Sequence, residues 1–189
     1  MGFIALERFD HADIPAVQAV LDACAEHLAT ATAAAAGRPS GPTAAARLFR
    51  NTPRSAKPSS KRILGICRPQ TCELLGIIDA IVGYPALDAI TVGLFALVPS
   101  AARPEVEGPV LRLLEEWAAA NGARTIRVVV HDASVGRLRL WLDAAYEAAE
   151  APMRAGGQLV VVVEKDLAHP DGPPAERDVY RRLAGRVGG

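Results

Sequence analysis

Asp79 is the residue whose position most needs a chemical explanation, because it interrupts an apolar run that reads Ile77-Ile78-Asp79-Ala80-Ile81. A carboxylate among such neighbours needs a partner or a raised pKa. With a raised pKa, Asp79 can act as a general base near neutral pH. It can instead face outward or pair with an arginine, so a structural role stays open beside the catalytic one.

Two further positions offer groups for proton transfer. His131 ends an expected strand over 125–130, at the carboxyl edge where sites of α/β proteins tend to lie. Tyr84 and Asp88 flank a turn between two other expected strands. His131 can equally cap the segment that follows it, and the other two can be ordinary turn residues.

The signatures of several other chemistries are missing. Cys24, Cys67 and Cys72 have no ligand spacing with the histidines, so we expect no metal. No Gly-x-Ser-x-Gly elbow or Walker loop supports a hydrolase or a nucleoside triphosphatase.

Basic and acidic residues both number 21, which argues against a nucleic-acid-coating protein. The sequence contains neither an apolar run of about 18 residues nor a signal peptide, so we expect a cytoplasmic protein with no membrane partner.

The elements that would position these groups follow from hydrophobic periodicity. We expect one domain over 1–167 and a Pro/Gly-rich tail with a short helix over 168–189. The first half predicts a strand over 3–9, an amphipathic helix beginning near Pro15, a short helix over 43–49 and antiparallel strands over 62–67, 73–82 and 89–98. The second half predicts a loop over 99–107, helices over 108–121 and 134–144, and strands over 125–130, 146–150 and 159–165. The order of strand, helix and strand favours a parallel crossover.

The join between the third of these strands and its helix carries a motif. It reads FALVPSAARPEVEGPVL over 95–111, and the later helix ends in LWLDAAY over 140–146. This order resembles the GNAT family of acyl-CoA-dependent acetyltransferases, in which a strand ending in Val-x-Pro precedes a loop Arg/Gln-x-x-Gly-x-Gly/Ala and a later helix ends in Leu-Tyr-x-x-x-Gly-Phe. The resemblance spans about 3–165, although only 92–146 carry motifs. It implies an α/β fold with a mixed, twisted central sheet of about six or seven strands and helices on both faces.

The resemblance also implies an activity, which is direct transfer of an acetyl group from acetyl-CoA to an amine of a small molecule or peptide. The cofactor would lie between the strands over 89–98 and 125–130, with its pyrophosphate at a helix N-terminus that presents free N–H groups. The implied cofactor-binding residues are Leu97, Val98, Arg103, Val106, Glu107, Gly108 and Ser134. A backbone N–H near Leu97 or Val98 would polarise the thioester. Asp79 or His131 would act as the base and Tyr84 or Tyr146 as the acid, unless water serves. Members of the family often pair through sheet edges, so a homodimer is one option.

The sequence departs from the family pattern at several of these positions. Val106 stands where the middle glycine belongs, Ser134 replaces an asparagine, and Trp141 replaces a tyrosine that often acts as the acid. Glu105 and Glu107 bring negative charge toward a dianionic ligand, which is unfavourable at close range. One alternative is therefore a catalytically inactive GNAT-fold domain that binds a ligand or partner. Another is an enzyme with a different donor geometry, in which a loop one residue longer turns both glutamates outward.

Overall fold

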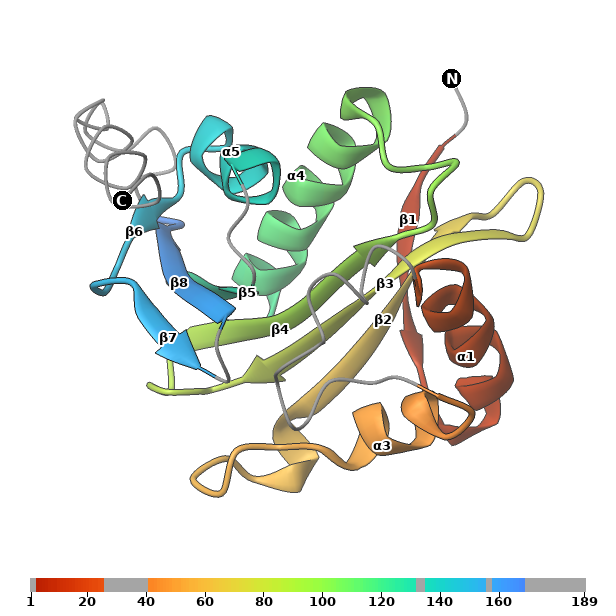
Figure 1. Ribbon diagram of the computed structural model, residues 1–189, viewed down its shortest axis with the longest axis horizontal. Coiled ribbons are helices and arrows are strands. Elements are labelled where there is room, and N and C mark those ends of the chain that lie inside the picture. Colours follow the sequence, from red (N-terminus) through yellow and green to blue (C-terminus); the bar gives the residue numbers. More distant parts are fainter. Residues whose placement is uncertain (1–2, 26–40, 132–134, 156–157, 169–189) are drawn as a thin grey trace.

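The computed structural model describes residues 3–25, 41–131, 135–155 and 158–168, and its centre is one eight-stranded sheet (Figure 1). The strands are β1 (Ala5–Phe9), β2 (Lys61–Arg68), β3 (Glu73–Val82), β4 (Ala89–Leu97), β5 (Thr125–His131), β6 (Glu147–Ala148), β7 (Met153–Ala155) and β8 (Gln158–Asp166). Their order is β1-β2-β3-β4-β5-β8-β6, and β7 also pairs with β8. Among these described strands, only the β4–β5 pair is parallel. The predicted fold class is confirmed.

Helices cover both faces of this sheet. The helical segments are η1 (His11–Asp13), α1 (Ile14–Ala23), α3 (Ala44–Arg50), η2 (Pro58–Ser60), α4 (Pro104–Ala120) and α5 (Val135–Asp143). Helices α4 and α5 lie on one face, and α1 and α3 on the other (Figure 1). Alternate residues of β3 therefore enter two cores: Ile78 packs beneath α4, and Ile77 packs beneath α1 and α3. Burial on both faces explains why β3 is apolar almost throughout.

Helix α4 begins at Pro104, four residues before the predicted start at Gly108. Proline suits the first helical position, because its φ is preset and its missing N–H has no intrahelical partner there. Two prolines five residues apart both meet this description, and the structure uses the first. Glu105 and Glu107 consequently lie in the first helical turn, where two residues of separation turn them about 200° apart around the axis. The two glutamates cannot both face the same surface.

Strands β4 and β5 pair only over Ala89–Val92 and Thr125–Val128 and diverge beyond that point. A register shift against β3 matches Asp79 with Leu94 and Ala80 with Val92, so Gly93 is the extra residue of a β-bulge. The bulge exchanges the two faces of β4. The side chains that follow it therefore alternate in the opposite sense to those that precede it.

The remaining predictions match the structure closely, with two differences. Strand β6 has two residues instead of the five predicted, and β7 was not predicted. The predicted tail over 168–189 and the Ala-rich continuation of the first helix lie almost wholly outside the described residues.

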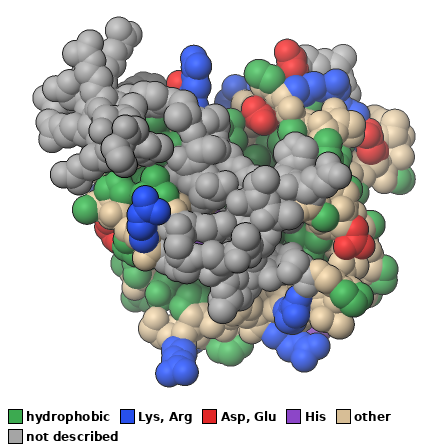
Figure 2. All heavy atoms as spheres, viewed as in Figure 1, with side chains coloured by type: hydrophobic (Ala, Val, Ile, Leu, Met, Phe, Trp, Pro, Cys, Tyr) green, Lys and Arg blue, Asp and Glu red, His purple; other side chains and the backbone are tan. Residues whose placement is uncertain are grey.

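None of the described helices is both long and apolar enough to cross a membrane. On the face shown in Figure 2, the charged side chains of the described residues are scattered rather than gathered into one basic patch.

Candidate active site

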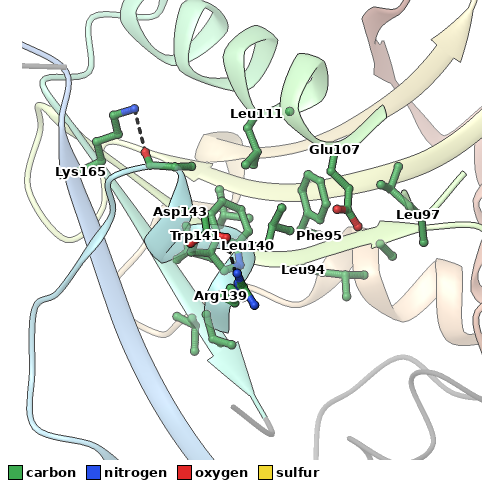
Figure 3. Close-up of a pocket in the computed structure, with 18 of the residues that line it drawn as sticks. Leu94, Phe95, Leu97, Glu107, Leu111, Arg139, Leu140, Trp141, Asp143 and Lys165 are labelled. Atoms are coloured by element: carbon green, nitrogen blue, oxygen red, sulfur yellow. Dashed lines mark hydrogen bonds and ion pairs between the residues drawn. The ribbon is translucent and has the colours of Figure 1, made fainter. Parts of the chain in front are cut away.

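The diverging ends of β4 and β5 form the floor of a cleft, which α4 and α5 wall (Figure 3). Its volume is about 890 Å³. Its lining is mainly apolar and includes Phe95, Leu97, Leu111, Leu140 and Trp141. The cleft lies where the resemblance places the cofactor, between the two parallel strands.

The open edge of β4 presents backbone groups to this cleft. In an antiparallel pair, successive residues direct their N–H and C=O groups alternately toward and away from the partner. Val98 donates its N–H to Leu75 O of β3 at 2.9 Å, so the groups of Leu97 and Phe95 point toward the β5 side. The thiol of Cys24, kept protonated by a pKa that burial raises, donates to Leu97 O at 3.2 Å. Leu97 and Phe95 can therefore donate to a ligand, whereas Val98 cannot.

The loop before α4 offers few free N–H groups. The residues whose N–H already donates to a backbone oxygen are Val98, Ala101, Ala102, Arg103, Val106 and Glu107. Pro104 has no N–H to offer. A diphosphate at a helix N-terminus needs several free donors that converge on it. The cleft thus fits an uncharged pantetheine arm, but this loop does not fit a diphosphate in the expected manner.

Glu107 and Gly108 line the cleft, whereas Val106 does not. Val106 is 3% exposed and packs in the core beneath α4, because the helix begins early and turns this side chain inward. Glu107 points from α4 into the cleft toward β4 (Figure 3). Glu105 lines a different hollow on the other side of the helix, beside Phe3. The expectation that a longer loop turns both glutamates outward is therefore correct for Glu105 alone.

Two aromatic residues, Phe95 and Trp141, line the inner wall of the cleft, and Tyr146 packs behind them. Trp141 meets Phe95 edge to face at 5.4 Å and Tyr146 at 5.1 Å. Tyr146 is fully buried, and burial together with the nearby charge of Glu115 raises the pKa of its phenol. The Nζ of Lys165 lies 5.7 Å from the Tyr146 ring and donates to both carboxylate oxygens of Glu115 at 2.9 Å. The alternative of Tyr146 as the acid is overturned, because its side chain does not reach the cleft.

Asp79 lies beside the bulge rather than in the cleft wall. Its side chain points to the α1 and α3 face, where Lys61 Nζ lies 2.8 Å from each carboxylate oxygen. Burial raises the pKa of Asp79 to about 6, although the charge of Lys61 lowers it in part. A side chain on Gly93 would place its Cβ 3.6 Å from Asp79 Oδ2, and Gly93 is exposed in the cleft. A proton acceptor therefore lies directly behind the cleft floor.

The other predicted site residues divide between the cleft and its surroundings. His131 lines the cleft at the end of β5. Tyr84 lies in the turn before β4, outside the cleft lining, and Ser55 Oγ approaches its hydroxyl at 3.5 Å. Arg103 is the exposed residue before α4, and Ser134 lies outside the described residues. No group of three metal-ligating side chains occurs among the residues that the structure describes.

Two residues of the site were missed by sequence reasoning. Phe95 has the same backbone direction as Leu97, and only the bulge at Gly93 determines that direction. A glycine inside a strand is the signal that could have revealed the bulge. Lys61 is not among the site residues expected from the sequence, whereas the structure buries it against Asp79.

Comparison with known proteins supports this architecture through structure alone. No known protein family and no curated protein matches the sequence. An acetyltransferase from Thermus thermophilus shares the fold with a TM-score of 0.63 at 18% identity, over 88% of this chain and 99% of the other. A protein from Desulfovibrio desulfuricans assigned to the GNAT family matches with a TM-score of 0.60 at 12% identity, over 87% and 99%. The spermidine N-acetyltransferase of Vibrio cholerae, solved with CoA and spermine, matches with 0.66 at 9%, over 89% and 98%.

These similarities establish the fold. The chain has the fold of the GNAT acetyltransferases over 87–89% of its length.

Proposed function

We propose that this protein is an N-acetyltransferase that moves an acetyl group from acetyl-CoA to an amine of a small molecule or peptide. The observation that carries the proposal is the cleft between β4 and β5, because an unpaired strand edge faces an apolar space there. A pantetheine arm has amide groups that can pair with such an edge and an apolar backbone that suits the lining.

The side chains around the cleft support a direct transfer. The amine attacks the thioester carbonyl, so a C–N bond forms and the C–S bond breaks, and the thiolate leaves. The N–H group of either Phe95 or Leu97 would donate to the carbonyl oxygen and stabilise its negative charge. Asp79, behind Gly93, or His131, in the cleft, takes the proton of the amine. Holding the two substrates together in the cleft supplies much of the rate.

A second function has its own observation in its favour. The N–H groups of the loop before α4 are largely occupied, and Glu107 points into the cleft. Both features weaken diphosphate binding. They favour a GNAT-fold domain that binds a ligand or partner without catalysis.

Calorimetric titration with acetyl-CoA and, separately, with coenzyme A distinguishes these two functions. Micromolar binding corresponds to about −8 kcal/mol and supports the transferase. An amine screen then follows, beginning with polyamines because the Vibrio cholerae neighbour is a spermidine acetyltransferase. Absence of binding at millimolar ligand would reject the transferase and leave the non-catalytic domain.

A further inference from the structure

Glu107 differs from the other carboxylates that line the cleft. Glu115 is paired with Lys165 at 2.9 Å, and Asp143 is paired with Arg139 at 3.2 Å. The Glu107 carboxylate has neither a hydrogen bond nor an ion pair within the described part of the chain. Glu107 is half-buried in this cleft, so its unpaired charge is less favourable there than at an exposed site.

Glu107 lies where its charge would act on the diphosphate of a bound donor. It lies in the first turn of α4, where a diphosphate would have to approach the helix, and it points into the cleft (Figure 3). Burial and the neighbouring charge of Glu105 raise the pKa of Glu107, so its surroundings already disfavour negative charge. A dianionic group brought close would disfavour that charge further.

We propose that Glu107 makes the donor site selective. The site admits the uncharged pantetheine arm of a thioester, whereas Glu107 disfavours a diphosphate beside α4. Binding of a diphosphate donor is therefore coupled to the uptake of one proton by Glu107. This inference rests on the proposed function, since it assumes that a thioester arm occupies the cleft. Coupling of this kind is reciprocal, because a ligand that raises the proton affinity of Glu107 binds more tightly when Glu107 is protonated.

Basic side chains of the cleft act in the opposite direction to Glu107. Arg112 also lines the cleft, and its guanidinium lies 3.9 Å from the place where a Cβ on Gly108 would be. Arg112 attracts a diphosphate, and Glu107 acts against that attraction from the same helix. Arg139 and Lys165, which also line the cleft, are each already paired with a carboxylate.

Two further titratable groups line the cleft from other elements. Cys24, just after α1, is uncharged because burial raises the pKa of its thiol. His131, at the end of β5, also attracts a diphosphate whenever its imidazole is protonated. This second attraction is the same in the wild type and in a Glu107 variant. The difference between their pH profiles therefore isolates the carboxylate of Glu107.

The chain supplies its own control for the experiment. Glu105 and Glu107 lie in the same helical turn, so both act on the helix N-terminus, but only Glu107 faces the cleft. We would titrate the wild type, Glu107→Gln and Glu105→Gln with acetyl-CoA and with S-acetylpantetheine, which carries no phosphate. Glu107→Gln should tighten acetyl-CoA binding about tenfold and leave S-acetylpantetheine within about twofold. Glu105→Gln should change either affinity by no more than about threefold.

The pH dependence provides a second readout. Wild-type affinity for acetyl-CoA should rise as the pH falls and Glu107 becomes protonated, whereas Glu107→Gln should show a flatter profile. Equal gains from both glutamine variants would overturn the inference, because the effect would then be one of general charge. Unchanged acetyl-CoA affinity in Glu107→Gln, with S-acetylpantetheine still bound, would overturn it as well. Binding of neither thioester by any of the three proteins would instead reject the proposed function on which the inference rests.

Discussion

The ammonium group of Lys61 lies 2.8 Å from the carboxylate of Asp79 inside the sheet, and the two side chains are only 7% and 11% exposed. The register explains the contact, because Asp79 pairs with Ile63 and Lys61 lies two residues further along the same face of β2. Lys61 also donates to Asn51 O at 2.6 Å, beyond the end of α3. The pair thus joins two strands to the helix layer that covers them.

Removing Lys61 alone should destabilise the fold strongly. Lys61→Met leaves the Asp79 carboxylate buried without its partner, and we expect a loss of about 3–5 kcal/mol in the free energy of unfolding. Arg68→Met is the control, since it breaks the more exposed pair with Glu73 and should cost about 1 kcal/mol or less. Urea denaturation measures both. A combined Lys61→Met and Asp79→Leu variant should recover most of the loss, and failure to recover would argue that Lys61 matters mainly through packing.

The pKa of Asp79 gives stability a specific pH dependence. Burial raises it from 3.8 to about 6, so between these values the folded state binds more protons than the unfolded state. The contribution of Asp79 to the free energy of unfolding therefore falls as pH rises from about 4 to about 6 and is level above. Its size is at most about 3 kcal/mol. Asp79→Asn should lack this slope in urea titrations across that range, and parallel profiles for the two proteins would refute the assignment.

The base assignment predicts a selective loss of turnover. Replacing Asp79 by Asn and His131 by Gln together should lower kcat by about 10²–10⁴, because both proposed acceptors of the amine proton are then removed. The Kd for acetyl-CoA, measured by calorimetry, should stay within about threefold. Turnover at the wild-type rate in this double variant would remove both residues from the mechanism.

The substitution Gly108→Ala tests how closely the donor approaches α4. A Cβ added there would meet only Arg112 Nη1, at 3.9 Å, so alanine is accommodated and should stabilise the helix by about 0.5–1 kcal/mol. The added methyl group lies at the cleft, and we expect it to weaken acetyl-CoA binding about tenfold. Thermal unfolding and calorimetry separate the two effects. Greater stability with unchanged affinity would place the donor away from this residue.

Tyr146→Phe should leave both stability and turnover close to wild type. The hydroxyl is buried and does not line the cleft, and the Glu115 carboxylate near it is already paired with Lys165 at 2.9 Å. Because Glu115 keeps that partner, removing the hydroxyl should change the free energy of unfolding by about 1 kcal/mol or less. A marked loss of kcat without loss of stability would show that the phenol takes part in the chemistry after all.

Much of the fold followed from the sequence because its strongest patterns are local. The β3 run over 73–82 was predicted to the residue, and the β4–α4–β5 crossover followed from its periodicity. The two-residue β6 and three-residue β7 are too short to carry a period. The start of α4 was misplaced because Pro104 and Pro109 both satisfy the same rule, and no local pattern distinguishes them.

The site was less predictable because its decisive features are not local. The partner of Asp79 comes from another strand, and sequence reasoning expected an arginine or solvent rather than Lys61. The orientation of Glu107 depends on where the helix begins, so the sequence left open whether this side chain faces the donor site or turns outward. The direction of the Phe95 amide depends on the bulge, for which Gly93 is the one local signal and the pairing with β3 is the proof.

The short ladder between β4 and β5 has a consequence for how the molecule holds together. Within the described residues, β1–β4 form one antiparallel half-sheet and β5–β8 form another, and only the pairs over Ala89–Val92 and Thr125–Val128 join them. The ladder is a seam four residues long, with α4 packed across it. Strand pairing between the two halves is therefore limited to one end of β4 and β5, and the shared core beneath α4 supplies the rest of their contact. A ligand bound in the cleft would contact both half-sheets beyond the end of the ladder. It would therefore stabilise them against separation.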